Sequence, residues 1–158
     1  MSGFRVAKDG VHGQAYTPPV NAASYVDVTW PTIIETDTTG GFDTATGMWT
    51  APSDGEFITG WQVWNQAGVG NGGGVTAKCI KNAGGPLDTA AIGSLGFFPN
   101  TAAMAGTMRY RVAAGDVFKI GNYCWPMPVV PPATTPPQIN IDARSEHTYW
   151  WGSFTPDA

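Results

Sequence analysis

The stretch GFDTATGMWTAPSDGEFITGWQVW, residues 41–64, decides the fold class. Its first half places single aromatic residues between turn-forming ones, and its second half has a two-residue apolar period. In an extended chain, Phe57 and Trp61 share one face, whereas Ile58 and Trp64 point to the other. A strand that is apolar on both sides is typically covered on both sides. We therefore expect a central β-strand here, with turns just before it.

The same two-residue period recurs along the chain, whereas helical periodicity does not. No window of a dozen residues shows a 3.6-residue apolar period without an interrupting Gly or Pro. Residues 113–116 form a predicted turn, which joins two predicted strands into a β-hairpin over residues 107–125. The other predicted strands cover residues 75–81, 138–142 and 147–154. Strands without helices between them indicate a sandwich or a closed barrel.

Length, composition and charge exclude several classes of protein. A chain of 158 residues predicts one domain. Charged residues make up 13%, against about 25% in an average soluble domain, which suggests that sister subunits cover part of the surface. The net charge is −4 and no basic run occurs, so we predict no nucleic-acid binding. Without a stretch of about 18 apolar residues, no membrane insertion is predicted. Residues 1–10 also lack the apolar core of a secretory signal.

The sequence offers no convincing enzymatic site. His12 and His147 are predicted surface residues, and no Gly-x-Ser-x-Gly elbow accompanies them. Turn and hydrogen-bonding roles account for the carboxylates near the first stretch: Asp37, Asp43, Asp54 and Glu56. Residues 68–73 match Gly-x-Gly-x-x-Gly, but a predicted strand follows where a phosphate site needs a helix. We therefore predict that the protein is not an enzyme.

Cysteine and metal chemistry are sparse. Cys79 and Cys124 each lie in an apolar, strand-like segment. This favours free buried thiols and leaves a disulfide between neighbouring strands open. Two cysteines and two distant histidines make no zinc pattern. No cofactor is predicted.

Residues 41–64 resemble the signature of the complement C1q globular-head family. The matching positions are Phe42, Asp43, Thr46, Gly47, Trp49, Pro52, Gly55 and Phe57. Three weaker pieces follow in family order: Lys81-Asn82 with Gly84, residues 114–117, and residues 149–154. In the last piece, Trp151 replaces the small residue of the family pattern.

The resemblance implies a C1q/TNF-like jelly roll, an all-β sandwich of ten strands in two antiparallel sheets. It also implies a homotrimer that binds rather than catalyses, here without the family's collagen-like Gly-X-Y stalk. Some family members hold calcium through loop carboxylates, and Asp88, Asp116 and Asp142 lie near predicted strand ends. Turn chemistry explains these three as well, so calcium is left open and not predicted.

The glycines and bulky aromatics of these motifs have simple physical roles. Gly47, Gly55 and Gly115 are expected at turns where a Cβ is costly. Asp43 is expected to accept hydrogen bonds from its turn backbone, and Asp116 closes the turn after Gly115. The layer between the sheets, about 10 Å thick, is expected to hold three large side chains: Trp49, Phe57 and Trp61.

The remaining aromatics are candidates for subunit contact. Trp150 and Trp151 are adjacent, so a strand sends them to opposite faces and at least one leaves the core. Burial between subunits is the favoured role, and contact with a ligand is the alternative. The candidate trimer-interface or ligand-contact residues are Trp64, Trp125, Tyr149, Trp150 and Trp151.

These features favour a virion protein as the first functional hypothesis. We expect a homotrimeric capsid decoration, head-fibre or tail-tip module, of phage or bacterial origin, that docks on a virus particle and contacts the host surface. Residues 1–21 are predicted to be an attachment arm that orders only on docking, and residues 22–158 the jelly-roll domain. The Gly-rich loop 68–74 and the Pro-rich loop 126–137 are expected to form exposed tips. The alternative is a carbohydrate- or protein-binding module of a bacterial surface or extracellular protein.

Overall fold

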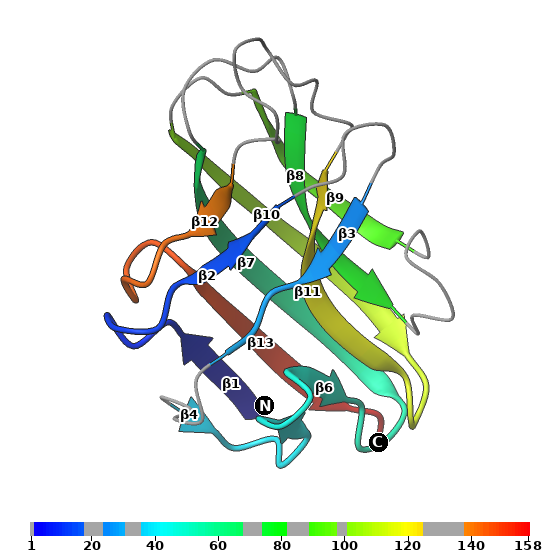
Figure 1. Ribbon diagram of the computed structural model, residues 1–158. Helices are drawn as coiled ribbons and strands as arrows, with labels where there is room; N and C mark the ends of the chain where they lie inside the picture. Colours follow the sequence, from blue (N-terminus) through cyan, green and yellow to red (C-terminus); the bar gives the residue numbers. More distant parts are fainter. Residues whose placement is uncertain are drawn as a thin grey trace, which may run out of the picture.

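The computed structural model describes residues 2–17, 24–30, 36–67, 74–81, 89–97, 101–124 and 138–158. These residues form thirteen β-strands and no helix, so they contain no helix that is long and apolar enough to cross a membrane. The strands build two antiparallel sheets that face each other (Figure 1). The prediction of an all-β sandwich with two antiparallel sheets is confirmed. The strand count exceeds ten because several strands are only two or three residues long.

Sheet A has seven strands, and the 13-residue strand β7 lies at its centre. Strand β10 pairs with one edge of β7, and both β13 and β12 pair with the other edge. The strands in spatial order are β2 (Gln14–Tyr16), β12 (Ile139–Ile141), β7 (Gly55–Ala67), β13 (Tyr149–Pro156), β1 (Ser2–Ala7) and β4 (Thr36–Asp37), with β10 (Thr101–Val112) beside β7.

Sheet B has six strands and is organised around β11, which pairs with β8 over residues 118–124. Its other edge is shared by β6 and β3. The strands in spatial order are β5 (Phe42–Asp43), β6 (Met48–Thr50), β11 (Val117–Cys124), β8 (Gly74–Lys81) and β9 (Thr89–Phe97), with β3 (Ser24–Asp27) beside β11.

The two-sided pattern of β7 is the one expected from the sequence. Phe57, Trp61 and Val63 face sheet B and are at most 2% exposed, whereas Ile58 and Trp64 lie on the outer face. Hydrogen-bonded neighbours on both edges leave this strand no exposed edge over most of its length. The strand is therefore the centre of the sheet, as predicted.

The space between the sheets is filled by stacked aromatic rings. Trp49 from sheet B lies on Phe57 from sheet A, with ring centroids 4.0 Å apart and an interplanar angle of 8°. Phe118 packs beside this pair, 4.9 Å from Phe57 and 5.9 Å from Trp49, and Phe4 meets Trp150 edge-on at 4.9 Å. Stacked and edge-on contacts of this kind are favourable geometries for aromatic pairs. The predicted core residues Trp49, Phe57 and Trp61 are all in this layer.

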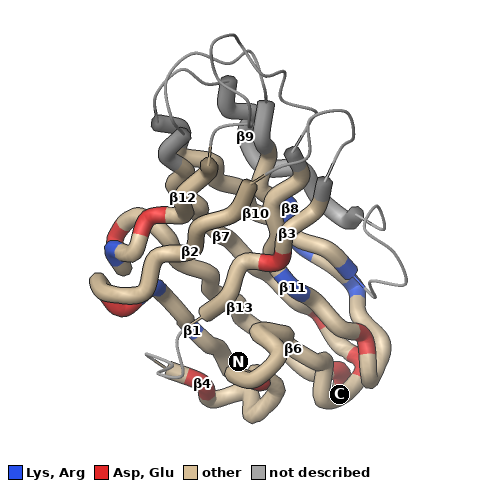
Figure 2. The backbone as a smooth tube through the Cα atoms, in the orientation of Figure 1, with Lys and Arg blue, Asp and Glu red and all other residues tan. Residues whose placement is uncertain are grey.

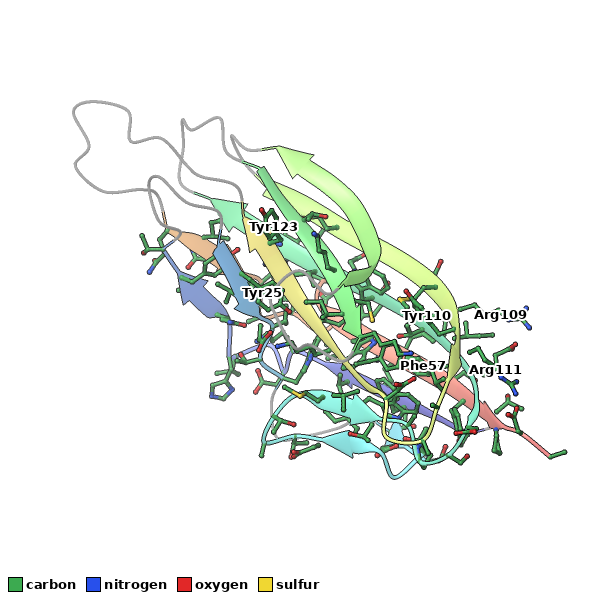
Figure 3. The ribbon with its side chains drawn as sticks, turned by 90° about the vertical axis from the view of Figure 1, so that its right-hand side faces the viewer. Tyr25, Phe57, Arg109, Tyr110, Arg111 and Tyr123 are labelled. Carbon is green, nitrogen blue, oxygen red and sulfur yellow. The ribbon has the colours of Figure 1, made fainter. Side chains whose placement is uncertain are left out.

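Strand β10 alternates as its sequence predicted. Tyr110 points toward the core, with its ring 5.7 Å from that of Phe118, while Arg109 and Arg111 point outward (Figure 3). Arg109 forms an ion pair with Glu56, and Arg111 forms one with Asp157. Basic and acidic residues consequently lie next to each other along the right-hand edge of the molecule (Figure 2).

The prediction that residues 1–21 form a separate arm is wrong for residues 2–7. These residues are strand β1, which pairs with β13 through six residue pairs and with β4 on its other edge. Phe4 and Val6 are at most 3% exposed and belong to the core. The sequence prediction underestimated this segment because its two core residues are separated by Arg5. Residues 18–21 lie outside the described residues.

The predicted hairpin over residues 107–125 is also wrong. A tight turn does join β10 to β11, closed by a hydrogen bond from Asp116 N–H to Ala113 O at 3.0 Å. The two strands nevertheless belong to different sheets, since β10 pairs with β7 and β11 pairs with β8. The turn therefore crosses from one layer to the other, and sequence alternation alone does not distinguish this crossing from a hairpin.

The turn before β6 is organised by Asp43. Its carboxylate accepts a hydrogen bond from Ala45 N–H at 2.9 Å and one from the Thr46 hydroxyl at 2.8 Å. These bonds, with that from Thr46 the larger cause, hold the pKa of Asp43 below its usual value. Gly47 ends the turn with φ +70°, a conformation that glycine adopts without a Cβ penalty.

Of the other motif residues, Gly115 and Asp116 belong to a turn, whereas Gly55 makes a close packing contact. Gly115 has φ +85°. Asp116 accepts a hydrogen bond from Ala113 N–H at 2.9 Å and pairs with Lys81 at 2.7 Å. Gly55, however, is not in a turn, because it begins β7. A Cβ at Gly55 would lie 2.7 Å from the Phe154 ring, so close packing explains this glycine.

Cys79 is a free, buried thiol in β8, and burial raises its pKa. This agrees with the favoured prediction for Cys79. The backbone of Cys124 ends β11, but its side chain lies outside the described residues, as do the Gly-rich segment 68–73 and the Pro-rich loop 126–137.

Lys8, directly after β1, is buried with a neutral partner. It is 3% exposed, and its ammonium donates to Thr29 O at 2.5 Å and to Thr29 Oγ1 at 3.3 Å. Burial lowers the pKa of Lys8 to about 8, an effect that the neighbouring Asp9 only partly opposes. The folded protein therefore loses this proton at a lower pH than the unfolded chain does.

From the lowered pKa of Lys8 we predict that the stability of the protein depends on pH. Between about pH 8 and pH 10.5 the unfolded chain holds the Lys8 proton and the folded chain does not, so this residue's contribution to stability increases with pH. The free energy of unfolding of the parent, minus that of Lys8→Met, should rise from pH 7 to pH 9.5 in urea titrations. Taking the difference cancels the titration of tyrosines and cysteines. A difference that stays constant over this range would contradict the prediction.

Candidate functional site

The outer face of sheet A carries a cluster of half-buried aromatic rings with small side chains between them. We call it the aromatic face and define it by Arg5, Ile58, Gly60, Gln62, Trp64, Ala105, Thr107, Tyr149 and Trp151. These positions come from four adjacent strands, β1, β13, β7 and β10. Strand register brings them together: Tyr149 and Ala105 both lie opposite Gln62, and Trp151 and Thr107 both lie opposite Gly60. The described strands form only two layers, so this face has no third layer of described strands above it.

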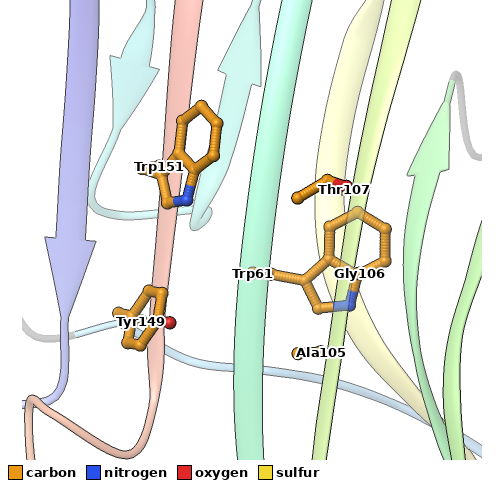
Figure 4. A pocket seen from close by; sticks show the side chains of 6 residues that line it. All are labelled: Trp61, Ala105, Gly106, Thr107, Tyr149 and Trp151. Carbon is orange, nitrogen blue, oxygen red and sulfur yellow. The ribbon is translucent and has the colours of Figure 1, made fainter.

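A hollow of about 300 Å³ lies in the middle of the aromatic face (Figure 4). Tyr149 and Trp151 project from β13 on one side of it, and the small residues of β10 lie on the other. The residues that line it are Trp61, Ala105, Gly106, Thr107, Tyr149 and Trp151. Its walls are therefore aromatic rings and small side chains.

Two glycines make room for the tryptophan rings beside this hollow. A Cβ on Gly60 would lie 2.7 Å from the Trp151 indole, and one on Gly106 would lie 2.4 Å from the Trp61 ring. Real Cβ atoms do not approach other atoms so closely. The Trp151 indole consequently lies flat against the backbone of β7 on the outer face, while Trp61 has the equivalent room on the inner face.

Trp150 and Trp151 point to opposite faces, as their adjacency requires. Trp150 is 0% exposed, and its indole N–H donates to Thr59 Oγ1 at 2.7 Å inside the core. The assignment of Trp150 to a subunit interface is therefore wrong. Its replacement by alanine removes core packing, at a cost of about 3–5 kcal/mol in each chain. Trp151 is the member of the pair that leaves the core, and Tyr149 shares its face.

The aromatic face has polar groups at its margins. The Arg5 guanidinium lies 5.4 Å from the centre of the Tyr149 ring. Trp64 stacks on His147 with ring centroids 4.2 Å apart and an interplanar angle of 17°. The Trp64 indole N–H is buried without a hydrogen-bond partner, whereas His147 Nδ1 lies 3.6 Å from Asp142 Oδ2. Gln62 donates from Nε2 to His147 O at 3.1 Å, which ties the turn before β13 to β7.

Carboxylates considered for calcium have other contacts in the structure. Asp142 pairs with Arg144 at 2.7 Å, and the hydrogen bonds from Arg144 lower the pKa of Asp142 to about 2. Asp116 pairs with Lys81, as described above, and Asp88 lies outside the described residues. Among the described residues, no three His, Cys, Asp or Glu side chains form a group suited to a metal ion. Trp125, a predicted interface residue, is also outside them.

Sequence reasoning found the aromatic members of this face but missed the small ones. Gly60 carried a usable signal, because a glycine inside a strand often marks the close approach of another group. No such signal marks Ala105, Thr107 or Arg5. Only the pairing of β10 and β1 with distant strands brings these residues beside Tyr149 and Trp151.

The described strands form a two-sheet jelly roll with half-buried aromatic rings on the outer face of sheet A. No protein-family model and no curated protein matches the sequence. Several solved structures resemble the fold, each at low sequence identity.

The globular domain of zebrafish complement 1qA protein aligns with a TM-score of 0.58 and 11% identity over 100% of both chains. Murine APRIL at pH 8.5 aligns with a TM-score of 0.59 and 11% identity over 98% of both chains. Eiger TNF from S. frugiperda aligns with a TM-score of 0.61 and 10% identity over 99% of this chain and 93% of that one. The chain therefore has the C1q/TNF-like jelly-roll fold.

The lack of a side chain at Gly60, beneath the Trp151 indole, leads to a testable prediction. In Gly60→Val, the new side chain occupies the space of the indole, so Trp151 must swing out from the sheet. We expect a loss of stability of about 1–3 kcal/mol in urea titrations and a shift of tryptophan emission to longer wavelength. The matched control is Gly10→Val, at a glycine where a Cβ meets nothing within 4 Å but φ is +84°. The control should leave the emission maximum unchanged, and an unchanged maximum in Gly60→Val would contradict this role of Gly60.

Proposed function

We propose that the protein is a non-enzymatic binding module that assembles as a homotrimer through the aromatic face. The fold supports this proposal, since the resembling structures are a globular domain of a complement protein, APRIL and a TNF. The observation that carries it is the hollow between Tyr149, Trp151 and Ala105, on a sheet face above which no further layer of described strands lies.

Assembly gives these side chains a physical role. Each Å² of apolar surface removed from water stabilises an association by about 25 cal/mol. A threefold arrangement lets a different patch of each neighbour cover the face and still closes the ring. Aromatic residues at the centre with charged residues at the rim are typical of protein interfaces. Here the Arg109–Glu56 ion pair lies toward the end of the same strands.

Ala105→Glu tests the trimer. Ala105 is exposed in the single chain, so its replacement leaves the core intact. It places an unpaired carboxylate in the hollow, which a neighbouring subunit would have to bury. We expect the parent to sediment as a trimer at micromolar concentration and Ala105→Glu to sediment as a monomer with an unchanged circular-dichroism spectrum.

Val11→Glu is the control for this experiment. Val11 is 77% exposed, and it lies between β1 and β2 and is not a member of the aromatic face. The same added charge should leave the trimer intact there. A parent that is monomeric at micromolar concentration, or a trimer that persists in Ala105→Glu, would overturn the proposed interface.

At a finer level we propose a structural role in a virus particle, of phage or bacterial type, as a capsid decoration, head-fibre or tail-tip module that contacts the host surface. The support is the compact jelly roll with low charge and without a Gly-X-Y repeat in this sequence. Docking is no longer assigned to residues 1–21, because β1 is a core strand and deleting it would unfold the domain. The virion is the corresponding location.

The virion role predicts association with particles. The protein, detected by a specific antibody, should co-sediment with purified virus particles through a density gradient and dissociate as a trimer. Recovery of all the protein in the soluble fraction, with none on particles, would contradict this role.

The second candidate is a carbohydrate- or protein-binding module on a bacterial surface or in the extracellular space. The paired rings of Tyr149 and Trp151 favour it, since aromatic side chains around a hollow suit an apolar ligand face. Selective binding on a glycan array that is lost in Trp151→Ala would favour this function over a purely structural one.

A further inference from the structure

Two asparagines meet inside the core, between the sheets. Asn65 of β7 and Asn122 of β11 come from strands in opposite layers (Figure 1), and both residues are 0% exposed. Asn122 Nδ2 donates a hydrogen bond to Asn65 Oδ1 at 2.7 Å. We call these two residues the amide pair. Their side chains share the inward faces of Val63 on β7 and Ile120 on β11, which belong to the hydrophobic core.

The amide pair has apolar neighbours within each sheet. The described side chains directly opposite in the strand register are Ile141 for Asn65, and Val26 and Ala77 for Asn122. These side chains have no hydrogen-bonding group. The hydrogen bonds of the pair therefore run between the sheets, including a longer one from Asn122 Nδ2 to the Tyr16 hydroxyl of sheet A at 3.3 Å.

Stability does not explain why two asparagines occupy this place. Asn65 Nδ2 and Asn122 Oδ1 are both buried without a hydrogen-bond partner. A buried polar group left without a partner costs more free energy than one hydrogen bond contributes, and an apolar pair of similar shape avoids that cost. Two apolar side chains would consequently make a more stable core than the amide pair does.

Alignment of the two sheets does explain it. Apolar burial is non-directional, so apolar inner faces pack in more than one relative alignment with a similar gain. A shift of β11 by two residues keeps the same face inward and brings Ile120 to the place of Asn122. Asn65 and Asn122 would then both face apolar groups. The hydrogen bond between the sheets thus disfavours the shifted alignment much more than apolar packing does.

We propose that the amide pair fixes the alignment of sheet B on sheet A, at a cost in stability. Asn65 lies two residues before the end of β7, and Asn122 lies two residues before the end of β11. A single buried asparagine selects one register in coiled coils by the same physics. The pair is inside the core of one chain, so the proposal does not depend on the trimer.

A double variant, Asn65→Val with Asn122→Val, tests the proposal. Valine ends at the γ position and suits a strand, so two valines fit where the amide groups met. The urea midpoint should rise by about 0.5 M or more, because no buried polar group remains without a partner. The ¹H–¹⁵N NMR spectrum should gain a second set of signals for β7 and β11, whereas the parent shows one set.

Three results with the double variant would overturn the proposal. They are failure to fold, a urea midpoint at or below that of the parent, and a single set of NMR signals that keeps the nuclear Overhauser effects between Trp49 and Phe57. The single variant Asn65→Val should lower the midpoint, because Asn122 then loses its main partner. A single variant as stable as the double one would also overturn it. In the parent, rapid hydrogen exchange at Asn122 Nδ2 would contradict the buried pair.

Thr59→Val is the matched control. Trp150 Nε1 donates to Thr59 Oγ1 at 2.7 Å, the same length as in the amide pair, but both residues belong to sheet A. The control should lower the urea midpoint, because the buried indole N–H loses its acceptor, and it should keep one set of NMR signals. A second set of signals in the control would show that any lost buried hydrogen bond loosens the core, and the special role of the amide pair would be refuted.

Discussion

The contact between Trp49 and Phe57 joins the two halves of the molecule. Trp49 comes from a three-residue strand of sheet B, and Phe57 comes from the longest strand of sheet A. Their rings stack at 4.0 Å, and Phe118 and Phe4 pack against them from the flanks. Because β7 pairs on both edges and is apolar on its inner face, it holds this stack in place. The positions of β13 and β10, and of the aromatic face beyond them, follow from it.

Glycines make room for this aromatic packing. Large rings fit tightly against a β-sheet only where the backbone beneath them lacks a Cβ. Gly60 accommodates Trp151, Gly106 accommodates Trp61, and a Cβ on Gly152 would lie 2.3 Å from the Phe4 ring. The high glycine content thus serves two purposes, turns with positive φ and contact surfaces for rings. The same device shapes both the core and the outer hollow.

The two outer faces of the sandwich suit different kinds of contact. The face of sheet A has uncharged rings and small residues around a hollow, and its charges lie at the margin. On the face of sheet B, the ammonium groups of Lys78 and Lys119 lie over the rings of Tyr123 and Tyr25. The two faces therefore differ in chemistry, one built from rings and small residues around a hollow and the other from cations stacked on tyrosines.

The amino-acid sequence by itself determined the all-β class, the two-faced strand β7 and the core positions of Trp49, Phe57 and Trp61. It also required Trp150 and Trp151 to point to opposite faces. All of these follow from the two-residue period of a strand, which is a local property. Only the tertiary structure decided that β1 is a core strand, that the turn at Gly115 crosses between sheets, and that Trp151 rather than Trp150 is outside. These depend on which strands pair, and pairing is set by contacts between residues far apart in the chain, such as Phe4 with Gly152.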